Sequence, residues 1–386
     1  MNTPSRRSLF ALLTFTLFAT ACTSVPPDGV ESNDNAPDLT PPADLPDIHN
    51  ERLRAVNDWA YQLQGEPLLD LDPIRQSVFD LVVVDYSADG GEDGEFTAEQ
   101  ISALQNDSDN PKIVLAYMSI GEAEIGRFYF DNAWVSPDPD HDPDGPFTLT
   151  DAAPSFLAPP NPDFPDNFKV RYWRDDWRQI IITNPGSHAV IKDAKSYLDR
   201  IIDAGFDGVY LDIIDAFEFF GPPDLTDGNG ERVDAASLMI DFVIAIADHA
   251  RNTRGCLDFL VFPQNGANII DDDSFPPGTI PENLSQEQYA TLRRIEYFTA
   301  IDGIGAEDSF YFGNDDENNP FDPQDHIIES LDTFRQAGLC VLSIDYLTDT
   351  TKIDDFYDRA RRQGWVPYAS VRDLSRLVIN QTQPPD

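Results

Sequence analysis

The segment from Gly205 to Asp215 reads Gly-Phe-Asp-Gly-Val-Tyr-Leu-Asp-Ile-Ile-Asp. It follows an amphipathic stretch over 189–204 whose apolar spacing predicts a helix, and Gly205 stands where such a helix usually ends. The apolar run at 208–213 then predicts a buried strand. The carboxylates of Asp212 and Asp215 lie at the end of that strand. A helix that leads through a glycine into a buried strand is the repeating unit of α/β proteins.

The same alternation extends over the whole chain of 386 residues. Further helical patterns end at Gly338 and Gly364. Eight short apolar runs predict strands at 59–63, 79–85, 113–119, 208–213, 259–262, 303–306, 340–344 and 366–370. Helical patterns between them cover 189–204, 235–251, 327–337 and 353–363. We therefore predict an α/β fold with a single (β/α)8 barrel of the TIM type. An open doubly wound sheet is the alternative, but no glycine-rich dinucleotide loop and no Walker phosphate loop support it.

Three long polar insertions, at 136–167, 271–288 and 314–325, each follow a predicted strand. In a barrel they would lie at the carboxyl-terminal rim, where long loops can wall an open groove. Within the first, Asp140, Asp142, Asp144 and Asp151 have the spacing of a calcium loop, although two prolines interrupt it. A solvated aspartate run is the favoured interpretation, and we expect no metal site.

Carboxylates and amides gather at the predicted strand ends. A single one would usually be a helix cap, but carboxylates at five of eight ends predict one shared pocket. Two carboxylates that flank a bond are what glycoside hydrolysis requires. With five histidines in the chain and no zinc or serine-hydrolase motif, histidine-based catalysis is poorly supported. Four aromatic residues could stack on sugar rings or simply pack in the core, namely Trp134, Tyr172, Trp173 and Trp177.

Three segments together resemble the endo-α-1,4-polygalactosaminidase family, glycoside hydrolase family 114. They are Leu-Ala-Tyr-Met-Ser-Ile-Gly-Glu-Ala-Glu at 115–124, Val-Arg-Tyr-Trp at 170–173 with Trp177, and the opening segment at 205–215. The resemblance implies a TIM barrel that cleaves polymers of α-1,4-linked galactosamine with retention of configuration. It also implies that Asp212 is the nucleophile and Glu307 the acid/base, with Asp215 as the rival to Asp212.

Further residues are predicted to bind substrate from their strand-end position or their aromatic character. We expect Asp85 and Asp215 to bind substrate or orient the catalytic pair, and Glu122 to contact substrate amines. The remaining candidates are Tyr86, Glu124, Tyr172, Trp173, Asn265, Asp345 and Tyr346. No cofactor is expected.

The chain is strongly acidic, with a formal charge of 26 − 69 = −43. Such a surface repels phosphate, which excludes nucleic acid as a partner. It suits solubility in high salt, a cationic ligand, or both. The leading hypothesis is therefore an endo-glycosidase, a monomer, that acts on a cationic amino-sugar polymer. A non-catalytic carbohydrate-binding lipoprotein and a hydrolase of another glycan remain open.

The amino terminus predicts export. Arg6 and Arg7 precede an apolar run at 9–21 that is too short to span a bilayer, and Cys22 follows in a context that resembles a bacterial lipobox. Residues 1–22 are thus expected to be an export signal with lipidation at Cys22, ordinary cleavage after Ala21 being the alternative. Lipidation would anchor the exported protein to the membrane, whereas ordinary cleavage would release it as a secreted protein.

The proline- and aspartate-rich stretch at 23–48 predicts a disordered tether, and 49–386 the catalytic domain. Cys256 and Cys340 start predicted strands that are not neighbours, so two separate buried thiols are favoured over a disulfide.

Overall fold

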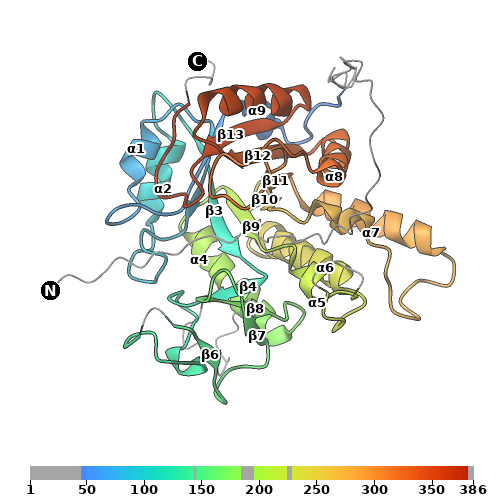
Figure 1. Ribbon diagram of the computed structural model, residues 1–386. Helices are drawn as coiled ribbons and strands as arrows, with labels where there is room; N and C mark the ends of the chain where they lie inside the picture. The colour runs from blue at the N-terminus through green and yellow to red at the C-terminus, as the bar shows by residue number, and fades with distance from the viewer. Residues whose placement is uncertain (1–44, 143–144, 184–194, 224–227, 381–386) are drawn as a thin grey trace, which may run out of the picture.

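The computed structural model describes residues 45–142, 145–183, 195–223 and 228–380 (Figure 1). The predicted export signal, Cys22 and the tether up to residue 44 lie outside the described residues. The last residues of the predicted tether contact the domain, since Arg335 donates to the Pro46 carbonyl at 2.7 Å. None of the helices in these ranges is long and apolar enough to cross a membrane.

Eight parallel strands form the centre of the molecule, at the positions that the apolar runs predict. One sheet has the order β1 (Trp59–Gln62), β2 (Leu81–Asp85), β3 (Ile113–Ser119), β9 (Gly208–Asp212) and β10 (Leu260–Pro263). The second has the order β11 (Gly303–Glu307), β12 (Cys340–Tyr346) and β13 (Val366–Ser370). Every ladder within these two sheets is parallel. The predicted α/β class and the strand positions are confirmed.

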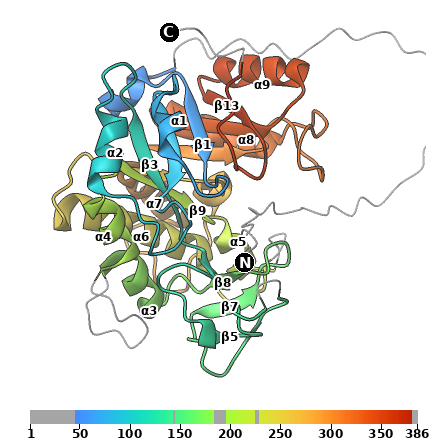
Figure 2. The same ribbon diagram turned by 90° about the vertical axis from the view of Figure 1, so that its left-hand side faces the viewer.

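The two sheets meet along two seams. At the first, an isolated parallel bridge joins Gln264 to Gly305, and the Asp302 N–H donates to the Val261 carbonyl at 3.0 Å. At the second, β1 and β13 lie side by side (Figure 2). There the Leu63 N–H donates to the Leu374 carbonyl at 3.0 Å, but no strand ladder joins β1 to β13 in the described ranges. The strands thus follow the order of a (β/α)8 barrel without a continuous ladder that closes it.

Helices cover the outer faces of the sheets, and those at 197–203, 235–248, 325–336 and 350–362 overlap the four predicted helical patterns. They are α1 (Leu71–Arg75), α2 (Ala98–Gln105), α3 (Asp175–Arg178), α4 (Tyr197–Asp203), α5 (Ala216–Phe220), α6 (Ala235–Asp248), α7 (Gln286–Ala300), α8 (Asp325–Gln336) and α9 (Thr350–Arg362). Shorter helical turns are η1 (Glu51–Ala55), η2 (Asn132–Trp134), η3 (Gln179–Thr183), η4 (His249–Thr253) and η5 (Ala267–Asp271). Gly205, Gly338 and Gly364, with φ of 81°, 80° and 74°, end α4, α8 and α9 as predicted.

The first long insertion is folded, which its polar composition did not predict. The strands in and around it are β4 (Glu122–Glu124), β5 (Val135–Ser136), β6 (Thr148–Leu149), β7 (Leu157–Pro160) and β8 (Asn167–Val170). All of their pairings are antiparallel, and they extend from the end of β3, in green at the bottom of Figure 1. Strands of two to four residues, some with prolines, give too little periodicity to be recognised in a sequence. The insertion builds a wall beside the strand ends, as the rim-loop prediction requires.

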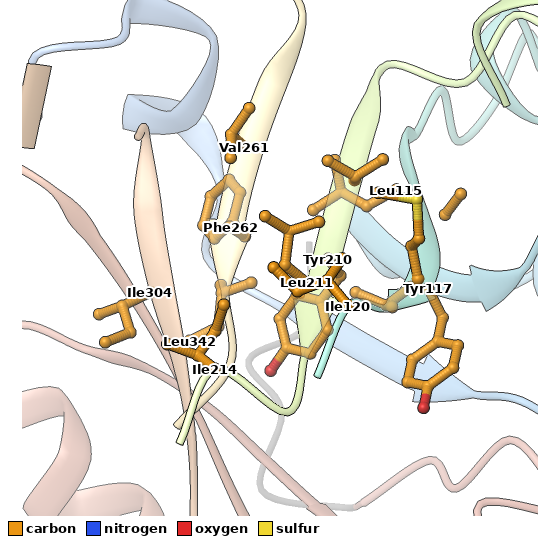
Figure 3. Packing of buried hydrophobic residues seen from close by; sticks show 14 of the residues in the cluster. Leu115, Tyr117, Ile120, Tyr210, Leu211, Ile214, Val261, Phe262, Ile304 and Leu342 are labelled. Carbon is orange, nitrogen blue, oxygen red and sulfur yellow. The ribbon is translucent and has the colours of Figure 1, made fainter. Parts of the chain in front are cut away.

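Large buried side chains fill the space inside the strands (Figure 3). Tyr210 of β9 points towards β11, where a Cβ atom on Gly305 would lie 1.8 Å from the tyrosine hydroxyl oxygen. Only glycine fits there, and Tyr210 therefore reaches between the two strands that carry the predicted catalytic carboxylates. The rings of Tyr61 and Tyr210 meet edge-on at 5.2 Å, which continues this aromatic layer to β1.

Both cysteines in the described residues are free. Cys340 is buried and Cys256 is half-buried, so the separate thiols that the strand positions favour are present and the alternative disulfide is not.

Candidate active site

The carboxyl ends of the strands bring the predicted catalytic pair to one rim. Asp212 is the last residue of β9 and Glu307 the last residue of β11, with β10 between them. Because parallel strands end on the same side, both carboxylates belong to the rim where barrel enzymes bind substrate. Asp212 is 7% exposed, whereas Glu307 is half-buried. The pair thus combines one carboxylate withdrawn from water with one more open to it.

Asp212 is held by a tyrosine from the neighbouring strand. The Tyr117 hydroxyl, from β3, donates to Asp212 Oδ2 at 2.7 Å. The next residue, Ile213, has a φ of 59°, which is strained for a β-branched side chain and typical of functional positions. Burial, and after it the charge of Glu307, raises the pKa of Asp212 well above its ordinary value, while the Tyr117 hydrogen bond opposes the rise.

Glu307 is fixed from two sides. Asn265 Nδ2 donates to Glu307 Oε2 at 2.8 Å, and the Glu307 N–H donates back to Asn265 Oδ1 at 3.0 Å. The Tyr346 hydroxyl, at the end of β12, makes a short hydrogen bond to Glu307 Oε1. Asn265 and Asp308 both have positive φ, 60° and 51°, so strained residues follow β10 and β11 as well as β9. The structure therefore brings Asn265 and Tyr346 to Glu307, close to where their strand-end positions suggested.

Two buried tyrosines lie beneath the pair. Burial raises the pKa of Tyr61 and of Tyr210 well above the ordinary value, and the charges of Asp212 and Glu307 both add to the rise. Each phenol therefore keeps its proton at neutral pH. Tyr61 donates to Gln264 Oε1 at 3.1 Å, while the Tyr210 hydroxyl has no hydrogen-bond partner in the described part of the chain. Both carboxylates thus lie close to two uncharged tyrosine side chains.

Asp85 and Glu124 are joined by an arginine that sequence reasoning missed. Arg127, 7% exposed, forms ion pairs with both, at 2.8 Å from Asp85 Oδ2. Its guanidinium also lies 5.7 Å from the ring centroids of Tyr86 and of Tyr117. Burial raises the pKa of Asp85 to about 6, although Arg127 lowers it. Asp85, Tyr86 and Glu124 therefore surround Arg127.

Glu122 and Asp215 belong to a second acidic group beside the pair. Glu122 is fully buried and accepts from Asn161 Nδ2 at 3.0 Å, with Lys169 Nζ at 3.5 Å. Its second oxygen has no hydrogen-bond partner in the described residues. Burial raises the pKa of Asp215 to about 7, followed by the charge of Glu218; Glu122 and Glu307 add to it and Lys169 opposes it. This corner holds more carboxylates than cations.

The other substrate-binding candidates have structural contacts. Asp345 is fully buried, and its Oδ2 accepts from the Tyr311 N–H at 3.2 Å, which ties down the loop after β11. Tyr172 is fully buried and donates to the Ala235 carbonyl at 2.8 Å. Trp173 is half-buried, edge-on to Tyr172 and Phe220. Their contact with substrate stays a prediction.

Two of the aromatic residues adopt the core-packing alternative. Trp134 is 5% exposed and Trp177 is fully buried, and the Trp177 indole donates to the Ile120 carbonyl at 2.9 Å. Of the three tryptophans considered for stacking on sugar rings, Trp173 is therefore the one whose indole is accessible.

Sequence reasoning also missed Tyr117, Lys169 and Tyr61. A usable signal was present, because Tyr117 and Ser119 stand two residues apart on β3 and so face the same side as its carboxyl-terminal site. Lys169 pairs with Glu122 across the unpredicted strands β4 and β8, so no sequence pattern could have placed it.

The calcium spacing at 140–151 is only partly described, since Asp144 lies outside the described residues. Nearby, Asp138 binds His141 at 3.0 Å. No group of three or more histidine, cysteine, aspartate or glutamate side chains that could hold a metal ion occurs within the described ranges.

The sequence profile of the glycoside-hydrolase family GH114 matches residues 42–383. The chain belongs to this family. A protein of Thermotoga maritima without an assigned function is 32% identical over 342 residues, which covers 86% of each chain. Another such protein, from Methanocaldococcus jannaschii, is 32% identical over 330 residues, covering 83% of this chain and 78% of the relative.

Among solved structures, the glycoside hydrolase domain of PelA from Pseudomonas aeruginosa is similar, with a TM-score of 0.53 at 15% identity. The match covers 84% of this chain and 99% of that domain. At this identity the likeness concerns the fold, which is that of glycoside hydrolases. Membership of GH114 makes a polysaccharide the substrate class, while the linkage and the mechanism are matters of proposal.

Proposed function

We propose that this GH114 protein cleaves internal α-1,4 linkages of a galactosamine-containing, cationic polysaccharide and retains the anomeric configuration. The observation that carries the proposal is the pair Asp212 and Glu307 at the ends of β9 and β11, each hydrogen-bonded by a tyrosine. We also propose that the eight strands act as a barrel, whose two seams would keep both carboxylates on one rim.

In the first step, a carboxylate oxygen of Asp212 attacks the anomeric carbon, and the glycosidic C–O bond breaks. The leaving oxygen takes the proton of Glu307, so a covalent glycosyl–Asp212 ester forms and Glu307 becomes ionised. In the second step, Glu307 takes a proton from water, whose oxygen attacks the anomeric carbon and releases Asp212. The half-buried position of Glu307 suits exchange with water, and the burial of Asp212 suits a nucleophile shielded from it.

A cationic substrate fits the electrostatics of this site. Burial and Glu307 raise the pKa of Asp212, which opposes the ionised form that must attack. An ammonium group bound near the pair favours that ionised form and so helps to activate the nucleophile. Asp215 and Glu122 supply the negative charge that would attract such an amine, with Asp85 and Glu124 largely neutralised by Arg127.

The decisive experiment measures reducing-end release from partly deacetylated α-1,4-galactosamine polymer by the protein from Thr23 onward. Cleavage by the parent, its loss in Asp212→Asn and in Glu307→Gln, and full activity in Asp258→Asn would support the proposal. Asp258 is an exposed carboxylate next to the start of β10, at the opposite end of the strands, and serves as the matched control.

Other outcomes would point elsewhere. Equal cleavage of fully acetylated polymer would indicate another glycan specificity and would leave the acidic surface to salt adaptation. Binding without cleavage, with Asp212→Asn changing affinity alone, would indicate a carbohydrate-binding protein. A folded parent that neither cleaves nor binds the polymer would contradict the proposal.

We further propose that the protein is exported and attached to the cell envelope by lipid at Cys22, as a monomer. The support for export and lipidation is the sequence of residues 1–22. Metabolic labelling with a fatty acid should mark the parent and not Cys22→Ser. Equal labelling of the two would contradict lipidation at this position.

A further inference from the structure

The Tyr117 hydroxyl lies between two carboxylates and carries a single proton to donate. It is 2.7 Å from Asp212 Oδ2 and 3.2 Å from Glu124 Oε1. Burial, and then the charges of Asp212 and Glu124, raise the pKa of Tyr117, so the phenol stays protonated. When both carboxylates are ionised they compete for the same hydrogen. The residue that holds Glu124 therefore influences how Tyr117 serves Asp212.

Arg127 holds Glu124. The Arg127 Nε donates to Glu124 Oε2, the oxygen that does not face Tyr117, and Nη1 donates to Asp85 Oδ1 at 3.0 Å. The guanidinium carbon also lies over the rings of Tyr86, Tyr117 and Tyr197, at 5.7, 5.7 and 6.0 Å from their centroids. Packed between rings and carboxylates, Arg127 has little freedom to move, and its positive charge remains behind Tyr117.

We infer that Arg127 is a positioning residue that keeps the Tyr117 hydroxyl directed at Asp212 by neutralising Glu124, the competing acceptor. Its effect on the reaction passes through Glu124 and Tyr117, and it touches no reacting atom. The inference rests on the proposed role of Asp212 as the nucleophile. It assigns a purpose to a buried cation that the cleavage steps themselves do not use.

The other groups that face Asp212 are fixed by different contacts. They are Tyr61 from β1, Tyr210 from β9 itself, Glu307 from β11 and Asp215 from the turn after β9. Among the described residues, the ion-pair partners of Arg127 are Asp85 and Glu124 and none of these groups. Removing Arg127 should thus act on Asp212 mainly along the path from Glu124 to Tyr117.

The test titrates the Asp212 carboxyl carbon by NMR in protein labelled at aspartate, the signal being assigned by its loss in Asp212→Asn. In Arg127→Met the Asp212 midpoint should rise by about one pH unit, since an unpaired Glu124 now draws the phenol proton. In the double variant Glu124→Gln, Arg127→Met the midpoint should return most of the way. Tyr117→Phe should raise it as Arg127→Met does.

The control is Arg200→Met. Arg200 of α4 is also 7% exposed and pairs with Glu92 and Glu95, so its loss should lower the melting temperature without moving the Asp212 midpoint. An unchanged midpoint in both Arg127→Met and Tyr117→Phe would overturn the inference. So would a double variant whose midpoint stays as high as that of Arg127→Met. If Arg127→Met fails to fold, Tyr117→Phe and Arg127→Lys, which keeps the charge and should keep the midpoint, decide the question.

Activity supplies the second readout. Arg127→Met should lower kcat by roughly ten- to a hundredfold, the effect of losing a hydrogen bond to a charged group, with KM within about twofold. The acid limb of its pH profile should move upward with the NMR midpoint. Because the titration needs no substrate, a parent that cleaves nothing contradicts the proposed function alone, whereas an unmoved titration contradicts this inference alone.

Discussion

Asp215 is expected to lower the stability of the protein at neutral pH for the sake of the site. It stands in the turn after β9, among the charges of Glu218, Glu122 and Glu307. Burial and these neighbours raise its pKa to about 7. Replacing Asp215 by asparagine should therefore stabilise the fold at about pH 8 and have little effect at about pH 4.

The magnitude follows from linkage. The pKa of Asp215 is about 7 in the folded protein and 3.8 as its ordinary value. Since the folded protein binds the proton more tightly, the group costs nothing below pH 4, and stability is lost as pH rises through 7. The full difference corresponds to about 4 kcal/mol at 1.36 kcal/mol per pH unit. Asp215 is half-buried, and water screens the charges around it. We therefore expect Asp215→Asn to raise the free energy of unfolding by about 1–2 kcal/mol at about pH 8.

The assay is urea unfolding of the parent, Asp215→Asn and the control Asp258→Asn at the two pH values. The free energy of unfolding of Asp215→Asn should exceed that of the parent at about pH 8 only, and Asp258→Asn should match the parent at both. A gain for Asp215→Asn that is equal at both pH values would refute the reasoning, because a packing effect does not depend on pH. A loss at about pH 8 would show that the electrostatic attraction of Lys169 outweighs burial and repulsion.

Three further outcomes follow. Gly305→Ala should destabilise the protein by about 1–3 kcal/mol in thermal unfolding, because its Cβ would meet the Tyr210 side chain. In a Tyr210→Ala background this clash is absent, so Gly305→Ala should there cause no further loss of stability. Arg372→Ala should lower the free energy of unfolding by about 3–5 kcal/mol at about pH 8, since it leaves Asp308 buried without its ion pair. Burial raises the pKa of Asp308 to about 6 although Arg372 lowers it, so loss of Arg372 raises this pKa further and the cost should shrink as the pH falls from 8 towards 6. Cleavage of deacetylated polymer should show kcat/KM falling as ionic strength rises; a constant kcat/KM would argue against electrostatic attraction of a cation.

The strands were predictable because buried parallel strands are continuous apolar runs, and every one of the eight lies where such a run does. Their carboxyl-terminal residues were predictable for the same reason: once β9 and β11 are located, Asp212 and Glu307 follow from position. The closed barrel was predicted from the eight strands, but no continuous ladder joins β1 to β13 in the described ranges, and contacts between the first and last strands leave no mark on either sequence. The β4–β8–β7 sheet was also missed, because its strands are shorter than the periodicity that reveals a strand.

The candidate site beyond the proposed catalytic pair depended on tertiary contacts. Arg127 lies three residues after Glu124 in a segment without a secondary-structure signal, and only the fold brings it to Asp85, 42 residues away in the chain. Tyr346 was placed correctly at a strand end, but its bond to Glu307 depends on how β11 pairs with β12. Asp345, one residue earlier on the same strand, points to the opposite side and is fully buried. Strand-end position identifies the rim, and the alternation of side chains then decides which residues face it.

The buried carboxylates separate the two explanations for an acidic chain. Adaptation to salt needs carboxylates that are exposed and hydrated, and the charge of −43 can largely be read in that way. Six carboxylates in the described residues are nevertheless buried, and five of them lie at strand carboxyl ends or just beyond: Asp85, Glu122, Asp212, Asp308 and Asp345, with Asp58 at the other end of the sheet. Hydration cannot account for groups withdrawn from water, whose burial is unfavourable.

Two arginines, Arg127 and Arg372, offset part of that cost, yet both lie against tyrosines that form hydrogen bonds with the proposed catalytic pair. Within the described ranges, Lys169 is the cation that offsets the remaining negative charge, through its ion pair with Glu122 and its effect on Asp215. A site of this kind is stabilised by whatever positive group enters it. The acidic surface can therefore serve solubility while the buried rim carboxylates serve the selection of an amino sugar that we propose.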